Sequence, residues 1–487
     1  MNLYKTNNLT LLTDLYELTM MQGYFFYKKD LNVVFDMFFR YQPFAGGYSI
    51  FAGLEPLIRT ILNFKFTDDD ISYLDKLNLF KPSFLRFLSK FKFRGDIYSV
   101  EEGEIVFPKE PLIRVHGNII ETQIIESILL NIVNFQTLIA TKTARIVEAA
   151  KGKVILEFGL RRAQGVDGAI SASRAAFIGG ASATSNVLAG KLFDIPVKGT
   201  MAHSWVMVFN SEFESFKKYV ELYPENTIIL VDTYDTLKKG IPSAIKVLKK
   251  LKRIKIKNFG IRLDSGDLEY LSKQARAMLD KAGLKEAKIV ASNELNEYII
   301  EQLVSKKAPI DFFGVGTNLV TAQGDSSLSG VYKLVAKKTK NKYVPSIKVS
   351  NTPEKTTNPH IKNILRVYDS ENLMVGDLIF LENEKENLYR ILKNKSPLVF
   401  YHPEYDYECI KVNRYKTYRI LLKNIVKNGK LNYDFPDLKN IQKKTKENLA
   451  TLHPSYKRFL NPHIYKVSLT EKLMKLKINL IRKLNLS

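Results

Sequence analysis

The chain has 487 residues, of which 45% are hydrophobic, and this is enough for a large buried core and two or three domains. No apolar run approaches the roughly 20 residues of a membrane span, and the single cysteine, Cys409, excludes an internal disulfide framework. The net charge is +24, which is typical of proteins that bind nucleic acid. However, the sequence has no Cys/His cluster with the spacing of zinc ligands and no alternation of basic and aromatic residues of the kind that stacks bases. The first residues lack the apolar core of a signal peptide, so we expect a cytoplasmic protein. Because nucleic-acid-binding motifs and a membrane-spanning run are absent from the sequence, we expect it to bind neither nucleic acid nor membranes.

The first part of the chain, residues 1–120, alternates apolar runs with turns. Strands are expected at 33–40, 96–100 and 111–115, and this mixture predicts an α+β domain. Residues 121–150 then show one long amphipathic helical pattern, whose apolar face suits a core or a dimer interface better than a ligand site.

The middle of the chain repeats one order: a short apolar run, a polar or glycine-rich loop, and a helix-like pattern. The apolar runs lie at residues 154–156, 227–231, 259–263, 289–291 and 310–313. A sixth unit has its apolar run at 193–197, so His203, in the next segment, is expected on the loop that leaves a strand. Six such units predict right-handed βαβ connections and an irregular (β/α) barrel over residues 121–335, with reactive groups at the carboxyl ends of its strands.

The last part, residues 336–487, predicts a C-terminal extension of which a portion packs back on the N-terminal domain. It follows a strand expected at 331–335 and begins with a lysine-rich, proline-punctuated stretch, 337–359. Short strands are expected at 378–381 and 418–422, and a basic amphipathic helix at 470–486. The lysines of this helix are expected to form a solvated face.

Two of the predicted loops can carry chemistry by their composition. His203 stands among small residues, where an imidazole can act as nucleophile, general base or phosphate acceptor, or can simply bond to its own backbone. Residues 314–317, Gly-Val-Gly-Thr, offer unobstructed backbone N–H groups before a helix start, which suits a phosphate but also suits a tight turn.

The charged residues at the strand ends suggest an anionic ligand. Arg161, Arg162 and Arg262 are available there for bidentate pairing with a carboxylate or phosphate. Asp264 and Asp267 can bind ribose hydroxyls, bind magnesium through water, or cap helices. The Rossmann, Walker and nucleophile-elbow motifs are absent, which argues against a dehydrogenase, a P-loop ATPase and an α/β-hydrolase.

These loops, taken with other segments in the same order, resemble nicotinate phosphoribosyltransferases over almost the whole chain. The resembling segments are residues 11–20, 38–40, 51–55, 134–142, 157–165, 183–190, 199–205, 262–267, 316–317 and 461–467. The resemblance implies an enzyme that joins nicotinate to 5-phosphoribosyl 1-diphosphate and releases diphosphate. It also implies coupling to ATP hydrolysis, with Mg²⁺ as cofactor.

The resemblance further implies roles for individual residues. His203 is implied to be phosphorylated transiently by ATP. Contacts to nicotinate are implied for Tyr16, Phe158, Thr200 and Arg262. Contacts to phosphoribosyl diphosphate are implied for Arg40, Arg161, Asp264, Gly316 and Thr317. Tyr16 and Arg40 stand far ahead of the barrel in sequence, and in the family such residues complete the site of a neighbouring subunit, which implies a homodimer.

Two enzyme alternatives and one of another class stay open. Nicotinamide and quinolinate phosphoribosyltransferases share the barrel, but nicotinamide-specific relatives carry an acidic residue near the position of Ser185 and Asn186. The neutral pair found here favours a carboxylate substrate. The alternative of another class is a basic nucleic-acid-binding protein.

Overall fold

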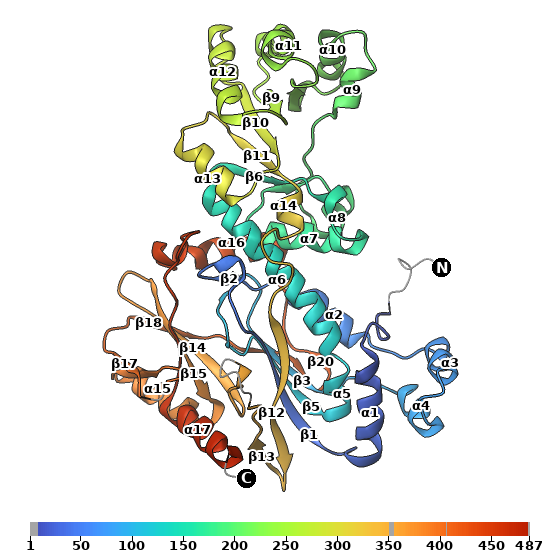
Figure 1. Cartoon of the computed structure of the whole chain (residues 1–487), viewed down its shortest axis with the longest axis vertical. Helices are drawn as coiled ribbons and strands as arrows, with labels where there is room; N and C mark the ends of the chain where they lie inside the picture. The colour runs from blue at the N-terminus through green and yellow to red at the C-terminus, as the bar shows by residue number, and fades with distance from the viewer. Residues whose placement is uncertain (1–7, 350–354, 406, 486–487) are drawn as a thin grey trace. The chain divides into compact units, whose positions relative to one another are not determined.

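The computed structural model describes residues 8–349, 355–405 and 407–485 (Figure 1). Part of the lysine-rich stretch, 350–354, the first seven residues and the end of the C-terminal helix lie outside the described residues. Contacts within the chain divide it into two compact units, residues 139–326 and the combination of 1–138 with 327–487.

Residues 139–326 are built around a parallel sheet of six strands that curls into half a barrel. The strands are β6 (Val154–Glu157), β7 (Ala183–Thr184), β8 (Thr227–Leu230), β9 (Phe259–Leu263), β10 (Lys288–Asn293) and β11 (Phe312–Val315). Their order in the sheet is β7-β6-β11-β10-β9-β8, and all five pairings are parallel. The predicted α/β class and five of the six predicted strand positions are therefore confirmed.

Helices alternate with these strands, as right-handed βαβ units require. They are α7 (Val166–Ile178), α8 (Val187–Phe193), α9 (His203–Met207), α10 (Glu212–Leu222), α11 (Ile241–Arg253), α12 (Leu268–Lys281), α13 (Glu297–Ser305) and α14 (Thr317–Val320). Several begin at side-chain caps, such as Asp267, which accepts a hydrogen bond from the backbone N–H of Tyr270 at the start of α12.

The strand predicted at 193–197 is wrong. Phe193 ends α8, Asp194 turns the chain with a φ of 53°, and Val197 makes only an isolated parallel bridge with Thr184. Pro196 lacks the N–H that a ladder needs, which explains why no strand extends through this run. His203 accordingly lies at the first position of the short helix α9 and not on a loop that leaves a strand.

The other unit contains two larger sheets. The first is antiparallel, in the order β13-β12-β1-β5-β3-β19-β20. Its strands are β1 (Asn32–Phe39), β3 (Asp96–Ser99), β5 (Ile113–Asn118), β12 (Gly330–Thr339), β13 (Lys342–Pro345), β19 (Lys423–Lys427) and β20 (Lys430–Leu431). The strands predicted at 33–40, 96–100, 111–115 and 331–335 fall in this sheet, and β19 from the C-terminal part of the chain pairs with β3.

The helices of the N-terminal part belong to the same unit, and a two-stranded ladder joins β2 (Ser49–Ile50) to β4 (Ile105–Val106). The helices are α1 (Leu15–Tyr27), α2 (Leu54–Leu62), α3 (Asp68–Lys76), α4 (Pro82–Leu88) and α5 (Ile119–Gln123). The buried side chains of the helices and of the first sheet form a large apolar core rich in phenylalanine.

The second sheet of this unit has the order β17-β16-β21-β15-β14-β18. Its strands are β14 (Lys362–Tyr368), β15 (Met374–Leu381), β16 (Leu398–Tyr401), β17 (Cys409–Val412), β18 (Thr417–Ile420) and β21 (Val467–Leu469), and the helices nearby are α15 (Lys385–Lys393), α16 (Leu438–Ala450) and α17 (Glu471–Asn485). The predicted basic helix is α17. Its face is not wholly solvated, because the Lys477 ammonium is buried and donates to the backbone oxygen of Pro403 at 2.7 Å.

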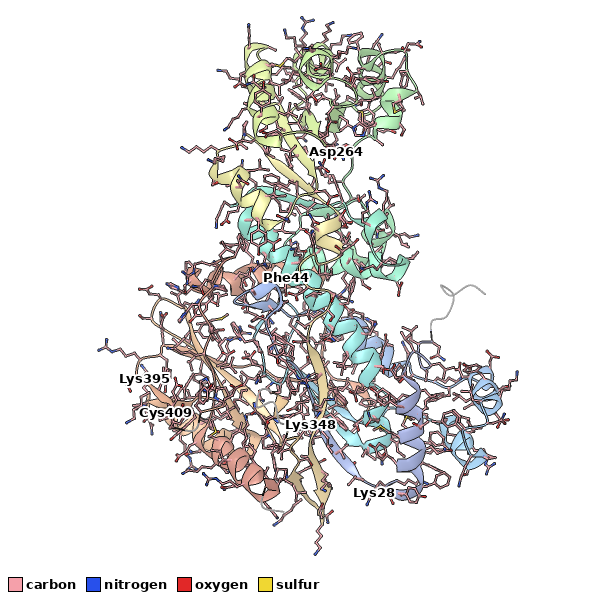
Figure 2. The ribbon with its side chains drawn as sticks, in the orientation of Figure 1. Lys28, Phe44, Asp264, Lys348, Lys395 and Cys409 are labelled. Atoms are coloured by element: carbon pink, nitrogen blue, oxygen red, sulfur yellow. The ribbon has the colours of Figure 1, made fainter. Side chains whose placement is uncertain are left out.

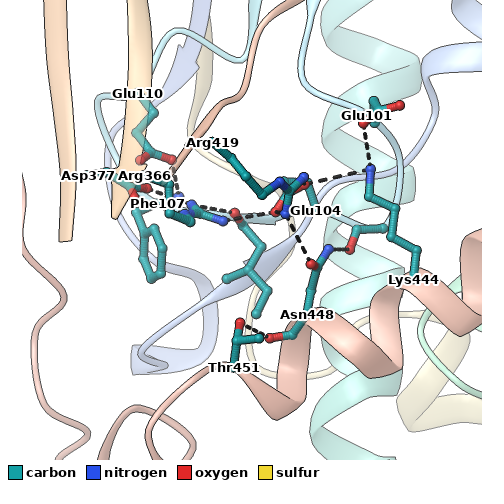
Figure 3. A network of polar contacts seen from close by, with 12 residues as sticks. Glu101, Glu104, Phe107, Glu110, Arg366, Asp377, Arg419, Lys444, Asn448 and Thr451 are labelled. Carbon is teal, nitrogen blue, oxygen red and sulfur yellow. Dashed lines mark hydrogen bonds and ion pairs between the residues drawn. The ribbon is translucent and has the colours of Figure 1, made fainter. Parts of the chain in front are cut away.

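A buried ion network ties these C-terminal elements to the segment that precedes β4 (Figure 3). Arg366, on β14, donates from Nε to Asp377 Oδ1 at 2.8 Å and from Nη1 to Glu104 Oε1 at 3.0 Å. The second oxygen of Glu104 accepts from Arg419 Nη2 at 2.6 Å. Removing one partner from such a network leaves a buried charge unpaired and typically costs about 3–5 kcal/mol.

The helical pattern predicted at 121–150 is two helices, α5 and α6 (Glu126–Ala149). Together, over 119–149, they are long and apolar enough to cross a membrane, which the sequence pattern did not indicate; among the described residues this is the one such stretch. In the most apolar part of this stretch, 61% is buried inside the protein, so the two helices belong to the core, as the amphipathic pattern predicts.

Candidate active site

An open cleft of about 580 Å³ lies at the carboxyl ends of the strands of the parallel sheet. Its size is in the range of small-molecule sites, and this end of a (β/α) barrel is where active sites are found. Eight of the ten residues predicted to form the site line the cleft: Phe158, Arg161, Thr200, His203, Arg262, Asp264, Gly316 and Thr317. Asp264, which is labelled in Figure 2, directly follows β9 in the chain.

His203 is paired with an aspartate that the sequence pattern did not single out. Its Nε2 lies 3.2 Å from Oδ1 of Asp232, and the His203 side chain is 40% exposed whereas that of Asp232 is 1% exposed. The other oxygen of Asp232 accepts from the backbone N–H of Asp264 at 2.6 Å and from Ser265 Oγ at 2.9 Å. Asp232 therefore holds the histidine on one side and the loop after β9 on the other.

Arg262 is the centre of a second group of contacts in the cleft. Its Nη1 donates to Thr200 Oγ1 at 2.9 Å, and its Nη2 donates to Asp264 Oδ1 at 2.7 Å. Its Nε donates to Ser292 Oγ at 2.8 Å. The guanidinium carbon lies 5.9 Å from the centre of the Phe158 ring, within the range of a cation–π contact. An aromatic face and a guanidinium edge in one place suit a flat, anionic ring.

Glycines fix the position of Phe158. A Cβ at Gly314 would lie 2.6 Å from the Phe158 ring, and a Cβ at Gly159 would lie 2.2 Å from a methyl group of Val320. Glu157, which is buried, accepts hydrogen bonds from the backbone N–H of Gly159, from Ser173 Oγ and from Thr184 Oγ1. The loop that carries Phe158 is therefore held by backbone packing and by a buried carboxylate together.

Groups that could hold a phosphate lie on the same rim. Arg161 is exposed on the single turn Leu160–Arg162, and Thr317 starts α14 after Gly316. Arg162 and Lys198 also line the cleft, so its rim is cationic. A cationic rim beside an uncharged glycine loop suits a phosphorylated ligand.

Tyr16 and Arg40, the other two predicted site residues, belong to the unit formed by 1–138 and 327–487. Tyr16, on α1, is 49% exposed. Burial of its hydroxyl and the neighbouring Glu17 carboxyl raise the pKa of Tyr16 well above its usual value. Arg40 follows β1, and its backbone N–H donates to Ser329 Oγ at 3.0 Å.

No metal ligand was predicted from the sequence, and the described residues contain no group of three or more His, Cys, Asp or Glu side chains arranged to hold a metal ion. Two carboxylates line the cleft and could contribute to a metal site, those of Asp264 and Glu294.

Sequence reasoning missed two buried residues at this site, Asp232 and Ser292. Asp232 was visible as a polar residue directly after an apolar run, the same signal that pointed to Asp264. Ser292 gives the same signal, because it directly follows the apolar run 289–291, but its importance rests on contacts with residues 28 and 30 positions away, which the sequence does not reveal.

Comparison with known proteins decides the family. The chain matches models of the nicotinate phosphoribosyltransferase N-terminal domain at residues 11–134, of the family as a whole at 154–388, and of its C-terminal domain at 361–477. It is 44% identical over 472 residues to nicotinate phosphoribosyltransferase of Bacillus subtilis, an alignment that covers 96% of this chain and 94% of that protein. The chain belongs to the nicotinate phosphoribosyltransferase family.

Other relatives agree with this family assignment. The nicotinate phosphoribosyltransferase of Caenorhabditis elegans is 36% identical, over 95% of this chain and 92% of that protein. The crystal structure of human nicotinic acid phosphoribosyltransferase superposes with a TM-score of 0.82 at 28% identity, covering 96% of this chain and 100% of that chain. Nicotinate-nucleotide pyrophosphorylase from Pyrococcus furiosus, at 22% identity and a TM-score of 0.70 over 93% of this chain and 98% of that chain, shares the fold. The resemblance to the family is confirmed.

Proposed function

We propose that this protein joins nicotinate to 5-phosphoribosyl 1-diphosphate, giving nicotinate mononucleotide and diphosphate, and couples the reaction to ATP hydrolysis. The activity named for its relatives supports the first part. The observation that carries the second is the pairing of His203 with a buried carboxylate, inside a cleft that also holds an arginine, an aromatic ring and a cationic rim.

Nicotinate would lie between Phe158 and Arg262. The ring of Phe158 offers a face for the pyridine, and Arg262 offers N–H groups for the carboxylate. Thr200, which accepts from Arg262 Nη1, supports the guanidinium on the cleft side. The pyridine nitrogen carries no proton at neutral pH, so it can attack the anomeric carbon without a general base.

Phosphoribosyl diphosphate would lie along the cationic rim. Thr317 and the backbone around Gly316 would hold the 5-phosphate, and Arg161 would pair with the departing diphosphate. Asp264 would bind ribose hydroxyls. Positive charge develops on the ribose ring as diphosphate leaves, and a nearby carboxylate stabilises that charge.

His203 would receive the γ-phosphoryl group of ATP. If Nε2–H donates to Asp232, the lone pair on Nδ1 is left to attack phosphorus while ADP departs with the electrons of the broken bond. Asp232 then holds the imidazole in this tautomer, as the carboxylate of a catalytic triad does. The phosphoryl group is finally transferred to water, which completes ATP hydrolysis.

Mg²⁺ is proposed as the cofactor. This ion is typically bound by one or two carboxylates together with substrate phosphates, and the cleft offers Asp264 without a dedicated metal cage. The ion would neutralise charge on the polyphosphate substrates.

A homodimer is proposed as the working assembly, with Tyr16 and Arg40 of one subunit completing the cleft of the other. This rests on the family resemblance of residues 11–20 and 38–40. We also propose a cytoplasmic location, since the free and exposed Cys409 suits a reducing compartment.

Product analysis tests this function. The protein is incubated with phosphoribosyl diphosphate, ATP, Mg²⁺ and one of nicotinate, nicotinamide or quinolinate, and the mononucleotides are identified by mass. We expect nicotinate mononucleotide from nicotinate, with diphosphate and ADP. Formation of product only from nicotinamide, or from quinolinate with release of carbon dioxide, would contradict the proposal.

A further inference from the structure

Ser292 is buried in β10 and contacts two charged residues that line the cleft, Arg262 and Asp264. Its Oγ accepts the hydrogen bond from Arg262 Nε at 2.8 Å. The same oxygen makes a very short contact with Asp264 Oδ1 and lies 3.4 Å from the backbone oxygen of Leu263. A serine hydroxyl has a single proton, and Arg262 Nε is itself a donor, so that proton is given to the Asp264 carboxylate.

These contacts fix the plane of the guanidinium. One edge of Arg262 is held by Ser292 at Nε and by Asp264 at Nη2, and these two partners are also bonded to one another. The remaining nitrogen, Nη1, points to Thr200 Oγ1 at 2.9 Å and to the Met201 backbone oxygen at 3.5 Å. Ser292 and Asp264 therefore occupy the Nε–Nη2 edge of the guanidinium, and a carboxylate would pair with its Nη1–Nη2 end, where it would share Nη1 with Thr200.

We propose that Ser292 is a positioning residue that, by holding Arg262 in one orientation, makes the cleft prefer a pyridine carboxylate to the uncharged amide. The inference rests on the proposed function. Bidentate pairing with a carboxylate requires a guanidinium edge at a defined angle, whereas an amide accepts through one oxygen and tolerates a rotated donor. Loss of orientation consequently weakens carboxylate binding more than amide binding.

The test compares three variants of the full-length protein with the wild type. Ser292→Ala removes the hydroxyl and Ser292→Thr keeps it. Ser272→Ala is the matched control, because Ser272 is a fully buried serine of the same unit whose hydroxyl donates to the backbone oxygen of Glu269. The measurements are kcat, KM for nicotinate, KM for phosphoribosyl diphosphate, the inhibition constant of nicotinamide and the thermal unfolding temperature.

For Ser292→Ala we expect KM for nicotinate to rise about tenfold, the effect of losing a hydrogen bond to a charged group. The inhibition constant of nicotinamide should stay within about twofold of wild type. KM for phosphoribosyl diphosphate should rise less than KM for nicotinate, because Asp264 loses the hydrogen bond from Ser292 but keeps its pairing with Arg262 Nη2. Ser292→Thr should recover most of the nicotinate KM, and Ser272→Ala should behave like wild type. A residue that acted only on folding would lower the unfolding temperature without changing the ratio of nicotinate to nicotinamide binding.

An unchanged nicotinate KM in Ser292→Ala would overturn the inference, and so would equal weakening of nicotinate and nicotinamide. A rise confined to the KM for phosphoribosyl diphosphate would also overturn it, because the hydroxyl would then act through Asp264 alone. If Ser292→Ala does not fold, Ser292→Cys gives the same comparison, since sulfur keeps the volume but is a weak acceptor. A wild type that makes no nicotinate mononucleotide would instead contradict the proposed function.

Discussion

At the scale of single residues, Asp232 decides how the cleft is organised. Its two oxygens serve different segments, one towards His203 and one towards the loop of Asp264 and Ser265. The carboxylate is buried, so each hydrogen bond is made in a low-dielectric setting, where charge-assisted bonds are strong. Substituting this one residue removes the carboxylate partner of His203 and one anchor of the loop of Asp264 and Ser265.

We predict that Asp232→Asn lowers ATP-dependent phosphorylation of the protein by at least about tenfold, since an amide does not stabilise the imidazole in the required tautomer as a carboxylate does. The ATP-independent rate should fall less. Incorporation of acid-labile phosphate from labelled ATP measures the first quantity. Asp235→Asn is the control, because Asp235 caps the turn at Lys238 three residues further on. Equal labelling of wild type and Asp232→Asn would refute the role given to this residue.

Glu17 is a second residue of interest, because its contribution to the stability of the fold should depend on pH. Burial raises the pKa of Glu17 to about 7, although Gln123 donates a hydrogen bond to it at 2.6 Å; the same amide also donates to Glu126 at 3.0 Å. A carboxyl whose pKa is higher in the folded than in the unfolded state stabilises the fold when it is protonated. For Glu17 this stabilisation is fully present below the unfolded pKa of 4.5 and is lost as the pH rises through the folded pKa of about 7.

Accordingly, the free energy of unfolding of wild type relative to Glu17→Gln should fall by up to about 3 kcal/mol between pH 4.5 and pH 8. Urea unfolding at several pH values measures this difference. Glu447→Gln, at an exposed glutamate on α16, should show no such change. A difference that stays flat over this range, or grows with pH, would contradict the account of Glu17.

Which site residues can be found from sequence follows from where they stand relative to a strand end. Arg262 and Asp264 flank the end of β9, and Thr317 follows β11, so the change from apolar to polar residues marks them. Ser292 also directly follows an apolar run, 289–291, but its position does not show which residues it contacts, because Arg262 and Asp264 lie on and just after another strand. Its role depends on the parallel pairing of β10 with β9, which only the folded sheet reveals.

At the scale of elements, the strands of the half-barrel were predictable where a strand is a continuous apolar run. Strands β6, β8, β9, β10 and β11 are of this kind, because parallel strands are covered on both faces. Strand β7 has two residues and leaves no such pattern. In the C-terminal sheet, β16 and β17 are four-residue strands whose pairing depends on contacts that no local pattern encodes.

Packing between β11 and the loop after β6 gives a prediction at this scale. Gly314→Ala places a methyl group 2.6 Å from the Phe158 ring, so the ring must move away from its present position beside Arg262. We expect KM for nicotinate to rise severalfold and stability to fall by about 1–3 kcal/mol, as overpacking typically costs.

Gly168→Ala is the matched control for this change. Gly168 lies inside α7 with no atom within 4 Å of a Cβ, so alanine should leave nicotinate binding unchanged and should not lower stability. Equal nicotinate KM values for the two alanine variants would show that the Phe158 ring does not form the nicotinate site.

At the scale of the whole molecule, one unit is assembled from both ends of the chain. Strand β12 pairs with β1 over a separation of about 300 residues, with Met37 opposite Tyr332, and β19 pairs with β3. Pairing over such distances is set by the complete sheet and leaves no signal in either segment. The sequence therefore indicated strands at β1, β3 and β12, indicated none at β19, and did not indicate how these strands pair.

The proposed dimer predicts complementation between two variants that are each impaired in the ATP-stimulated reaction. Arg40→Ala removes a group that one subunit would supply, and His203→Ala removes one in the cleft of the other, so a mixed dimer contains one intact site. Mixing the two proteins under conditions that allow subunit exchange should restore up to about a quarter of wild-type activity, with hybrids forming half of the dimers. No recovery, after exchange has been demonstrated with labelled subunits, would exclude a shared site.

The central claim is that His203 carries a phosphoryl group from ATP during nicotinate phosphoribosyl transfer, and its most direct test is phosphate labelling of wild type and His203→Ala. With ATP and Mg²⁺, wild type should acquire an acid-labile, base-stable phosphate, and the variant should acquire none. The variant should still form nicotinate mononucleotide slowly, because Arg262 and Thr317 are untouched, but ATP should no longer accelerate the reaction. A variant that keeps both the label and full stimulation by ATP would contradict the claim.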